Sequence, residues 1–270
     1  MIELEGLISR LRNQLRKFYI FGRLSSMVPP ESIMHDGTPT YEDFKINAGK
    51  GMKLFVEVAG LLPDEKILDI GSGIGRKTLF LPQYLSDHGS YDGLDIVKPG
   101  VDWCTRKVTS KFPNFHFHHI DIFNQHYNPT GIYRASEFRF PFKDGSFDLI
   151  TMFSVFTHMM PADVENYLAE TTRMLRPGGR SLITWFLLNT ESTGLISTGK
   201  SAYPLTHEVG DNCCVFDPAV PERIVGYKES YVLATYKDVG PTIREPIRYG
   251  SWCGREGLPF FQDMIVADRL

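Results

Sequence analysis

Short apolar runs alternate with amphipathic stretches through the middle of the chain. Between most of these runs, apolar residues recur at helical spacing, for example over 76–86, 101–110 and 162–175. The runs that we predict to be strands are KILDI (66–70), SYDGLDI (90–96), NFHFHHI (114–120), FDLITMF (147–153) and RSLITWFL (180–187). Strands that alternate with helices at this spacing form βαβ units, so the pattern predicts an α/β fold with a parallel sheet covered on both faces. Right-handed crossovers bring the carboxyl ends of such strands to one edge, where small ligands bind.

The region before the first strand predicts a helical cap over residues 1–60. A helical stretch runs from about Tyr41 to Val58 and ends at Gly60. Nearer the start, apolar residues recur at helical spacing with basic residues largely off the stripe: Leu4, Leu7, Ile8, Leu11, Leu15 and Phe18. We expect this helix to pack on the body of the protein or on another subunit in a homo-oligomer. Peripheral contact with a membrane, or with nucleic acid, is the alternative, since basic amphipathic helices do both.

The region after the fifth strand predicts an insertion and then the completion of the sheet. Residues 189–220 are rich in Ser, Thr, Gly and Pro, which is typical of an inserted segment or lid. In the C-terminal part, 221–270, we expect a helix near 221–236 and strands near 242–249 and 262–268. With the core over 61–188, the chain is therefore expected to form a doubly wound, mostly parallel seven-stranded sheet. The segment 121–143 replaces a simple crossover helix with an irregular, polar and aromatic stretch.

A glycine-rich loop follows the first predicted strand, in the sequence KILDIGSGIGRKT over 66–78. Glycines allow a tight turn and bring bare backbone against a ligand, and the following helix offers free N–H groups. A dinucleotide fingerprint needs Gly or Ala at the position of Arg76. A phosphate-binding P-loop needs a glycine at the same position, and Asp69 would repel a triphosphate. The pattern G-x-G-x-G after an acid suits a ligand that is cationic where it meets the loop.

The segment ILDIGSGIGR resembles motif I of class I S-adenosylmethionine-dependent methyltransferases. Further segments resemble this family in its own order, over about residues 45–190: YDGLDI, HHIDI, FPFKDGSFDLITMFSVFTHM and LRPGGRSLITWF. The block 144–187 looks most like bacterial small-molecule or sugar-directed members. The resemblance implies a Rossmann-like methyltransferase fold, with 61–188 as the cofactor-binding core, and S-adenosylmethionine as cofactor.

The resemblance also assigns roles to residues at the strand ends. It implies that Asp95 binds the ribose hydroxyls and that Asp121 meets the adenine amino group. The full set implied to bind the cofactor is Asp69, Gly71, Ser72, Gly73, Gly75, Arg76, Asp95, Ile96, Asp121, Ile122, Phe153 and Ser154. His158 follows the fourth strand, where the resemblance places the reactive end of the cofactor, and it is a candidate general base.

Each assignment has a structural alternative. Asp69, expected near the methionine amino group, could instead cap the next helix or bond a loop N–H. Arg76, expected on the methionine carboxylate, could be a solvated arginine at a helix start. Ile96 and Ile122, expected to sandwich adenine, suit the core equally, and His158 could fix its loop. Further candidates for the pocket wall, by position alone, are Trp103, Tyr203, His207 and Trp252.

The histidines and cysteines do not predict a metal site. His116 and His118 share one strand face and His119 the other, and no acid on that element completes a ligand set. The cysteines at 104, 213, 214 and 253 form neither a Cys-x-x-Cys pair nor a disulfide framework. Because the first twenty residues also lack the pattern of a secretory signal, we expect a reducing, cytoplasmic setting.

Composition narrows the class of protein. The chain has 270 residues, 42% of them hydrophobic, and a net charge of -3, so a wholly disordered chain and a whole-protein nucleic-acid footprint are disfavoured. No apolar run is long enough to span a bilayer. We therefore predict methyl transfer from S-adenosylmethionine to a small molecule or saccharide, with oxygen as the preferred nucleophilic atom of the acceptor. The alternatives are a non-catalytic module that binds S-adenosylmethionine or a nucleotide, a nucleic-acid-directed methyltransferase, and a P-loop phosphotransferase.

Overall fold

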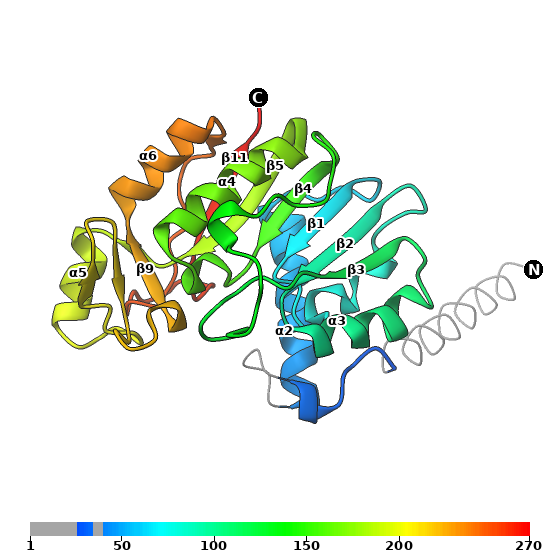
Figure 1. Cartoon of the computed structure of the whole chain (residues 1–270), viewed down its shortest axis with the longest axis horizontal. Helices are drawn as coiled ribbons and strands as arrows, with labels where there is room; N and C mark the ends of the chain where they lie inside the picture. The colour runs from blue at the N-terminus through cyan, green and yellow to red at the C-terminus, as the bar shows by residue number, and fades with distance from the viewer. Residues whose placement is uncertain (1–25, 35–39) are drawn as a thin grey trace, which may run out of the picture.

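The computed structural model describes residues 26–34 and 40–270 of the chain. The predicted helix over Leu4–Phe18 lies outside the described residues. The centre of the molecule is a seven-stranded sheet with the order β10-β11-β5-β4-β1-β2-β3 (Figure 1). Its strands are β1 (Lys66–Ile70), β2 (Ser90–Asp95), β3 (Phe115–His119), β4 (Phe147–Met152), β5 (Leu175–Trp185), β10 (Thr242–Ile243) and β11 (Asp263–Asp268). The first five pair in parallel, whereas β11 is antiparallel to β5 and β10 to β11, so the predicted mostly parallel sheet is confirmed.

Helices cover both faces of this sheet. Strand residues alternate between the two faces, so Leu68 and Ile150 lie in one apolar core while Ile67 and Leu149 lie in the other. The helices α2 and α3 pack on the second core, and α4 and α6 on the first (Figure 1). Their bounds are α2 Tyr41–Lys53, continued by a π-helical turn η2 at Leu54–Val58, α3 Lys98–Cys104, continued by a π-helical turn η5 at Thr105–Thr109, α4 Pro161–Met174 and α6 Glu229–Val239.

The prediction of one continuous α-helix over 76–86 is wrong. The chain instead forms two short 3-10 helices, η3 at Arg76–Leu79 and η4 at Leu81–Gln83. Pro82 lacks an N–H group, and its ring clashes with the carbonyl one helical turn earlier, so a continuous α-helix cannot pass through it. The glycine loop is therefore followed by a tight turn rather than by a regular helix.

Residues of the predicted insertion form a second, four-stranded sheet together with residues on either side of it, in the order β6-β9-β8-β7. Its strands are β6 (Leu187–Leu188), β7 (His207–Val209), β8 (Cys213–Val215) and β9 (Val225–Lys228), and α5 spans Thr190–Ser197. The helix predicted near 221–236 begins later than expected. Val225 and Tyr227 are fully buried in β9, which pairs with both β8 and β6, and α6 starts only at Glu229.

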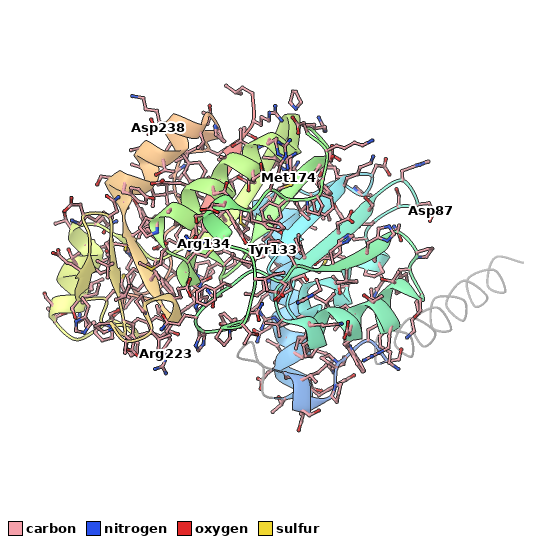
Figure 2. All side chains as sticks on the ribbon, in the orientation of Figure 1. Asp87, Tyr133, Arg134, Met174, Arg223 and Asp238 are labelled. Atoms are coloured by element: carbon pink, nitrogen blue, oxygen red, sulfur yellow. The ribbon has the colours of Figure 1, made fainter. Side chains whose placement is uncertain are left out.

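The segment between β3 and β4 is irregular, as predicted. Its only regular element in the described structure is a 3-10 helix, η6, at Ala135–Glu137. Residues 121–124 fold back on 131–133, where Phe123 N donates to Tyr133 O over 2.8 Å. Figure 2 shows the side chains of Tyr133 and Arg134 beside each other on this segment. The remaining 3-10 helices are η1 (Glu31–Ile33), η7 (Phe156–His158) and η8 (Pro221–Arg223).

A buried ion pair joins the end of the N-terminal helical segment to the sheet. Arg180 on β5 donates to both carboxylate oxygens of Glu65 over 2.8 Å and to the carbonyl oxygen of Gly60 over 2.7 Å. It also contacts the carbonyl oxygen of Ala59. Because both charged side chains are about nine-tenths buried, this contact fixes the entry into β1 in a setting of low dielectric. Within the part of the chain that is described, no helix has the length and apolar character needed to cross a bilayer.

Candidate active site

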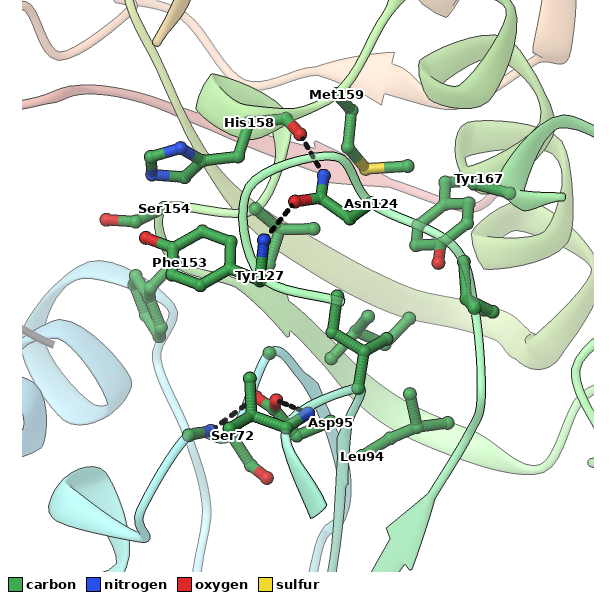
Figure 3. A pocket seen from close by; sticks show the side chains of 18 of the residues that line it. Ser72, Leu94, Asp95, Asn124, Tyr127, Phe153, Ser154, His158, Met159 and Tyr167 are labelled. Carbon is green, nitrogen blue, oxygen red and sulfur yellow. Dashed lines mark hydrogen bonds between the residues drawn. The ribbon is translucent and has the colours of Figure 1, made fainter. Parts of the chain in front are cut away.

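A cavity of about 350 Å³ opens at the carboxyl ends of β1, β2 and β4 (Figure 3). A volume of this size is typical of small-molecule sites. The predicted site residues that line it are Gly71, Ser72, Gly73, Arg76, Asp95, Ile96, Ile122, Phe153, Ser154 and His158. Tyr203, a candidate by position alone, also lines the cavity. The fold thus brings residues from five separate stretches of the chain together around one cavity.

Three of the residues predicted to bind the cofactor lie outside the cavity wall, and so do Trp103, His207 and Trp252, which were candidates by position alone. Asp69 is fully buried beneath the loop. Gly75 packs on α3, since a Cβ placed there would lie 2.6 Å from the sulfur of Cys104. Asp121 accepts a hydrogen bond from Asn128 Nδ2 over 2.9 Å, inside its own loop.

The glycine loop is held in place by the carboxylate of Asp95. Gly71, Gly73 and Gly75 all have positive φ, at 77°, 59° and 75°, a region that other residues enter at a cost. Asp95 accepts from Gly73 N and from Val97 N, each over 2.7 Å. Since each carboxylate oxygen has two lone pairs, Asp95 keeps acceptor capacity for a ligand diol while it fixes the loop.

The residues present fit an adenosyl ligand. Ser72 is 3% exposed, and its Oγ has no hydrogen-bond partner among the described residues, although it lines the cavity. A buried hydroxyl without a partner carries a free-energy cost that a ligand relieves. Leu94, Ile96 and Ile122 provide an apolar wall next to Asp95. Ser72, Asp95 and this wall would hold the polar and flat parts of such a ligand.

His158 differs from the expected general base in its ionisation. Its side chain is mostly buried, and its Nδ1 lies 3.3 Å from the carbonyl oxygen of Glu222. Burial lowers the pKa of His158 to about 4, against an ordinary value of 6.5. A general base that acts near neutral pH usually has a pKa close to 7, so this low pKa makes His158 a weaker base than an ordinary histidine. The imidazole is neutral at pH 7 but is a weak base.

The sequence did not single out the loop residues that cover His158. Asn124 donates from Nδ2 to the carbonyl oxygen of His158 over 2.8 Å and accepts from Tyr127 N over 2.9 Å (Figure 3). The Tyr127 ring lies edge-on to the His158 ring, with 5.1 Å between centroids. No pattern in the irregular 121–134 stretch indicates these contacts, because they depend on how the loop folds over η7.

Two carboxylates on the cavity wall were also missed. Asp163, in the first turn of α4, accepts from Met160 N over 3.2 Å, and Glu222, in η8, accepts from Gln125 N. Burial raises the pKa of each above its ordinary value. A polar ligand in the cavity could therefore contact these two acidic groups.

Ser154 adopts a strained backbone conformation at the end of β4. Its φ is 57°, the only positive value among the described non-glycine residues. Its N donates to Thr184 Oγ1 over 2.8 Å, and its hydroxyl donates to Gln262 over 2.9 Å. Strain of this kind costs about 1–3 kcal/mol and tends to occur at functional sites.

Comparison with known proteins identifies a methyltransferase domain in the chain. Residues 68–183 match the family described as "Methyltransferase domain". A phthiotriol/phenolphthiotriol dimycocerosates methyltransferase of Mycobacterium ulcerans is 30% identical over 129 residues, which are 48% of this chain and 39% of that protein. A demethylmenaquinone methyltransferase of Tropheryma whipplei is 26% identical over 48% of this chain and 45% of its own length. The matched part thus spans less than half of the length of these relatives.

Solved structures share the fold. A S-adenosylmethionine-dependent methyltransferase from Methanosarcina mazei aligns with a TM-score of 0.53 and 22% identity, over 80% of this chain and 96% of that one. A 1,6-didemethyltoxoflavin-N1-methyltransferase from Burkholderia thailandensis, solved with its substrate and S-adenosylhomocysteine, aligns with a TM-score of 0.54 and 15% identity, over 95% and 89% of the two chains. At these identities the likeness concerns the arrangement of the elements.

Proposed function

We propose that residues 68–183, which match a methyltransferase domain, bind S-adenosylmethionine, and that the chain methylates a hydroxyl oxygen of a small organic acceptor. The observation that carries the proposal is the cavity itself, which is lined by the glycine loop, by the acidic side chains of Asp163 and Glu222 and by the neutral imidazole of His158. Carboxylates accept hydrogen bonds from hydroxyl groups, so a saccharide or another polyhydroxylated molecule suits this wall.

Methyl transfer from a sulfonium mainly requires that the protein align the acceptor oxygen, the methyl group and the sulfur. When bound, S-adenosylmethionine supplies a methyl group on a positively charged sulfur, which is already an activated leaving group. Orientation alone supplies about 7–11 kcal/mol when the reacting atoms are held near attack distance. Ser154, His158 and Tyr127 line the cavity where the acceptor would lie. The proton of the acceptor hydroxyl would pass to His158 or to a carboxylate of the wall.

The test is turnover with a panel of acceptors. Incubation with S-adenosylmethionine and, separately, sugars, phenols and quinols should yield S-adenosylhomocysteine and an O-methylated product from a hydroxylated member. Tight binding of S-adenosylhomocysteine without turnover of any member would instead support a non-catalytic binding module. Magnesium-dependent ATP binding without affinity for S-adenosylhomocysteine would support the P-loop alternative.

A second candidate is carbon methylation of an aromatic ring on an apolar acceptor. Exposed apolar side chains gather on the loop at the mouth of the cavity: Phe123, Tyr127, Ile132 and Tyr133. Phe123 and Tyr127 also line the cavity, so an acceptor with an apolar tail could lie across this loop. The named relatives include methyltransferases of demethylmenaquinone and of phthiotriol dimycocerosates. Nuclear magnetic resonance of the methylated product separates the two candidates, because O-methyl and C-methyl carbons differ widely in chemical shift.

We expect Gly71→Val to abolish most of the affinity for S-adenosylhomocysteine. A Cβ at Gly71 would lie 2.4 Å from Val155 Cγ2 on the opposite wall, and its φ of 77° strains any larger residue. A displaced loop loses about 2 kcal/mol or more of binding, which is about 30-fold in Kd. Calorimetry measures the change.

The matched control for Gly71 is Gly145→Val. Gly145 has a similar φ of 65°, but it lies away from the cavity, and its Cβ would come no closer than 3.7 Å to Arg176. This variant shares the backbone strain and should keep wild-type affinity. Equal losses in both variants would show that strain, rather than the loop, explains the effect.

The low pKa of His158 predicts a flat pH dependence. Because its pKa is about 4, the imidazole is already neutral above about pH 5.5, so its ionisation should not change turnover between pH 5.5 and 8. His158→Gln should lower kcat more than affinity for S-adenosylhomocysteine if the imidazole takes the proton. An inflection of kcat/KM near pH 6.5 that disappears in His158→Gln would contradict this expectation.

A further inference from the structure

The ammonium of Lys77 lies against the floor of the cavity, beneath the glycine loop. Its Nζ is 3.2 Å from Asp69 Oδ1 and 3.1 Å from the carbonyl oxygen of Gly71. It also lies over the Phe153 ring, 4.8 Å from the centroid. The side chain is 9% exposed and lines the cavity, so a ligand can reach it.

Lys77 already donates to the oxygen atoms that the ammonium group of a ligand would need as acceptors. Asp69 is fully buried and also accepts from Tyr91 OH over 2.6 Å and from Thr151 Oγ1 over 2.8 Å. All partners of this carboxylate are therefore groups of the chain itself. Burial raises the pKa of Asp69 and the charge of Lys77 opposes that rise, which is the expected behaviour of a buried ion pair.

Lys77 itself has one donor left. An ammonium carries three N–H groups, and the two oxygens of Asp69 and Gly71 engage two of them. Among the described residues no further oxygen accepts from Nζ. This remaining N–H group can donate to an oxygen of a ligand in the cavity. A carboxylate oxygen is the acceptor that gives the strongest hydrogen bond of this kind.

We propose that Lys77 takes the place of the ligand's amino group on Asp69 and Gly71, and recognises the amino-acid end of the cofactor through its carboxylate. This inference rests on the proposed function, because it concerns the same nucleoside ligand. Lys77, which no sequence motif indicated, then determines which end group of the ligand binds beside the glycine loop. Affinity then depends on the carboxylate of the ligand and hardly on its amino group.

Three nucleosides test this by calorimetry at pH 7.5. They are S-adenosylhomocysteine, its deaminated analogue 5'-deoxy-5'-(3-carboxypropylthio)adenosine, and its decarboxylated analogue 5'-(3-aminopropylthio)-5'-deoxyadenosine. Loss of one charge-assisted hydrogen bond weakens binding by about tenfold or more. The wild-type protein should bind the decarboxylated analogue at least about tenfold more weakly than S-adenosylhomocysteine, and the deaminated analogue within about threefold.

Lys77→Met should reverse this order. With Lys77 gone, its carboxylate preference is lost, while Asp69 and the carbonyl oxygen of Gly71 become available to the amino group of the ligand. The decarboxylated analogue should then bind about as well as S-adenosylhomocysteine, and the deaminated one at least about tenfold more weakly. Lys98→Met, which removes an exposed lysine paired with Asp102 on α3, is the matched control and should keep the wild-type order.

A second variant keeps the test valid if Lys77→Met does not fold. Lys77→Met leaves Asp69 buried without a counter-charge, which is destabilising. The double variant Asp69→Asn/Lys77→Met removes both charges and should still lose the carboxylate preference. Equal losses for both analogues in the wild type, or an unchanged carboxylate preference in the variants, would overturn the role of Lys77. Failure of all three nucleosides to bind the wild type would instead overturn the proposed function.

Discussion

Replacing Asp95 with alanine is expected to weaken binding of S-adenosylhomocysteine by about 100-fold, or about 3 kcal/mol. Two effects add in this variant. The carboxylate holds the loop through Gly73 N and Val97 N, each at 2.7 Å, and those donors lose their acceptor. The same carboxylate is the one proposed to accept from the ligand diol. Titration calorimetry with S-adenosylhomocysteine gives the size of the loss.

Asp92→Ala is the matched control for this prediction. Asp92 lies on the same strand, β2, but its carboxylate contacts His118 at 2.8 Å, away from the cavity. Its removal should leave the affinity within about twofold of the wild type, since neither Asp92 nor His118 lines the cavity. A comparable loss in both variants would mean that β2, rather than the Asp95 carboxylate, had been disturbed.

Arg180→Met is expected to lower the free energy of unfolding by about 3–5 kcal/mol, because it leaves the buried Glu65 carboxylate without its counter-charge. It also removes the donor to the carbonyl oxygen of Gly60. Urea unfolding followed by circular dichroism measures the loss. The double variant Glu65→Gln/Arg180→Met should recover part of it, since no charge then remains unpaired in the interior.

An exposed pair provides the comparison for Arg180. Arg244 contacts Asp268 at 2.5 Å, but its side chain is 45% exposed. Arg244→Met should therefore cost only about 0–1 kcal/mol. If both arginine variants lost the same stability, the buried position of the Glu65–Arg180 pair would not be what matters.

Much of the fold could be predicted because its patterns are local. The five parallel strands each form a short apolar run, and β1 leads directly into Gly71, Gly73 and Gly75. The position of Asp95 follows from parallel pairing alone, which brings the carboxyl ends of β1 and β2 side by side. Gly71 N and Ser72 N accordingly both donate to the carbonyl oxygen of Leu94.

The rest depends on contacts between distant parts of the chain. The periodicity over 76–86 suggested a helix, but Pro82 divides it into 3-10 turns, and the inward position of Lys77 does not follow from the pattern. The low pKa of His158 arises from burial beneath residues near 124 and 222, which the sequence does not place there. The late start of α6 has the same origin, because β9 is stabilised by pairing with β8 and β6.

The passage of the chain from β5 into β6 has a consequence for engineering. Leu187, the first residue of β6, donates from its N to Asp263 Oδ2 over 2.7 Å, so the small sheet is anchored where β5 ends beside β11. The stretch between β6 and β9 returns to the same place, while the glycine loop lies on the other side of β4. Tyr203 and Glu222 of that stretch line the cavity, whereas Cys213 and Val215 are buried in the main core. Redesign of the cavity wall should therefore exchange the residues around 203 and 222 and keep β8 intact.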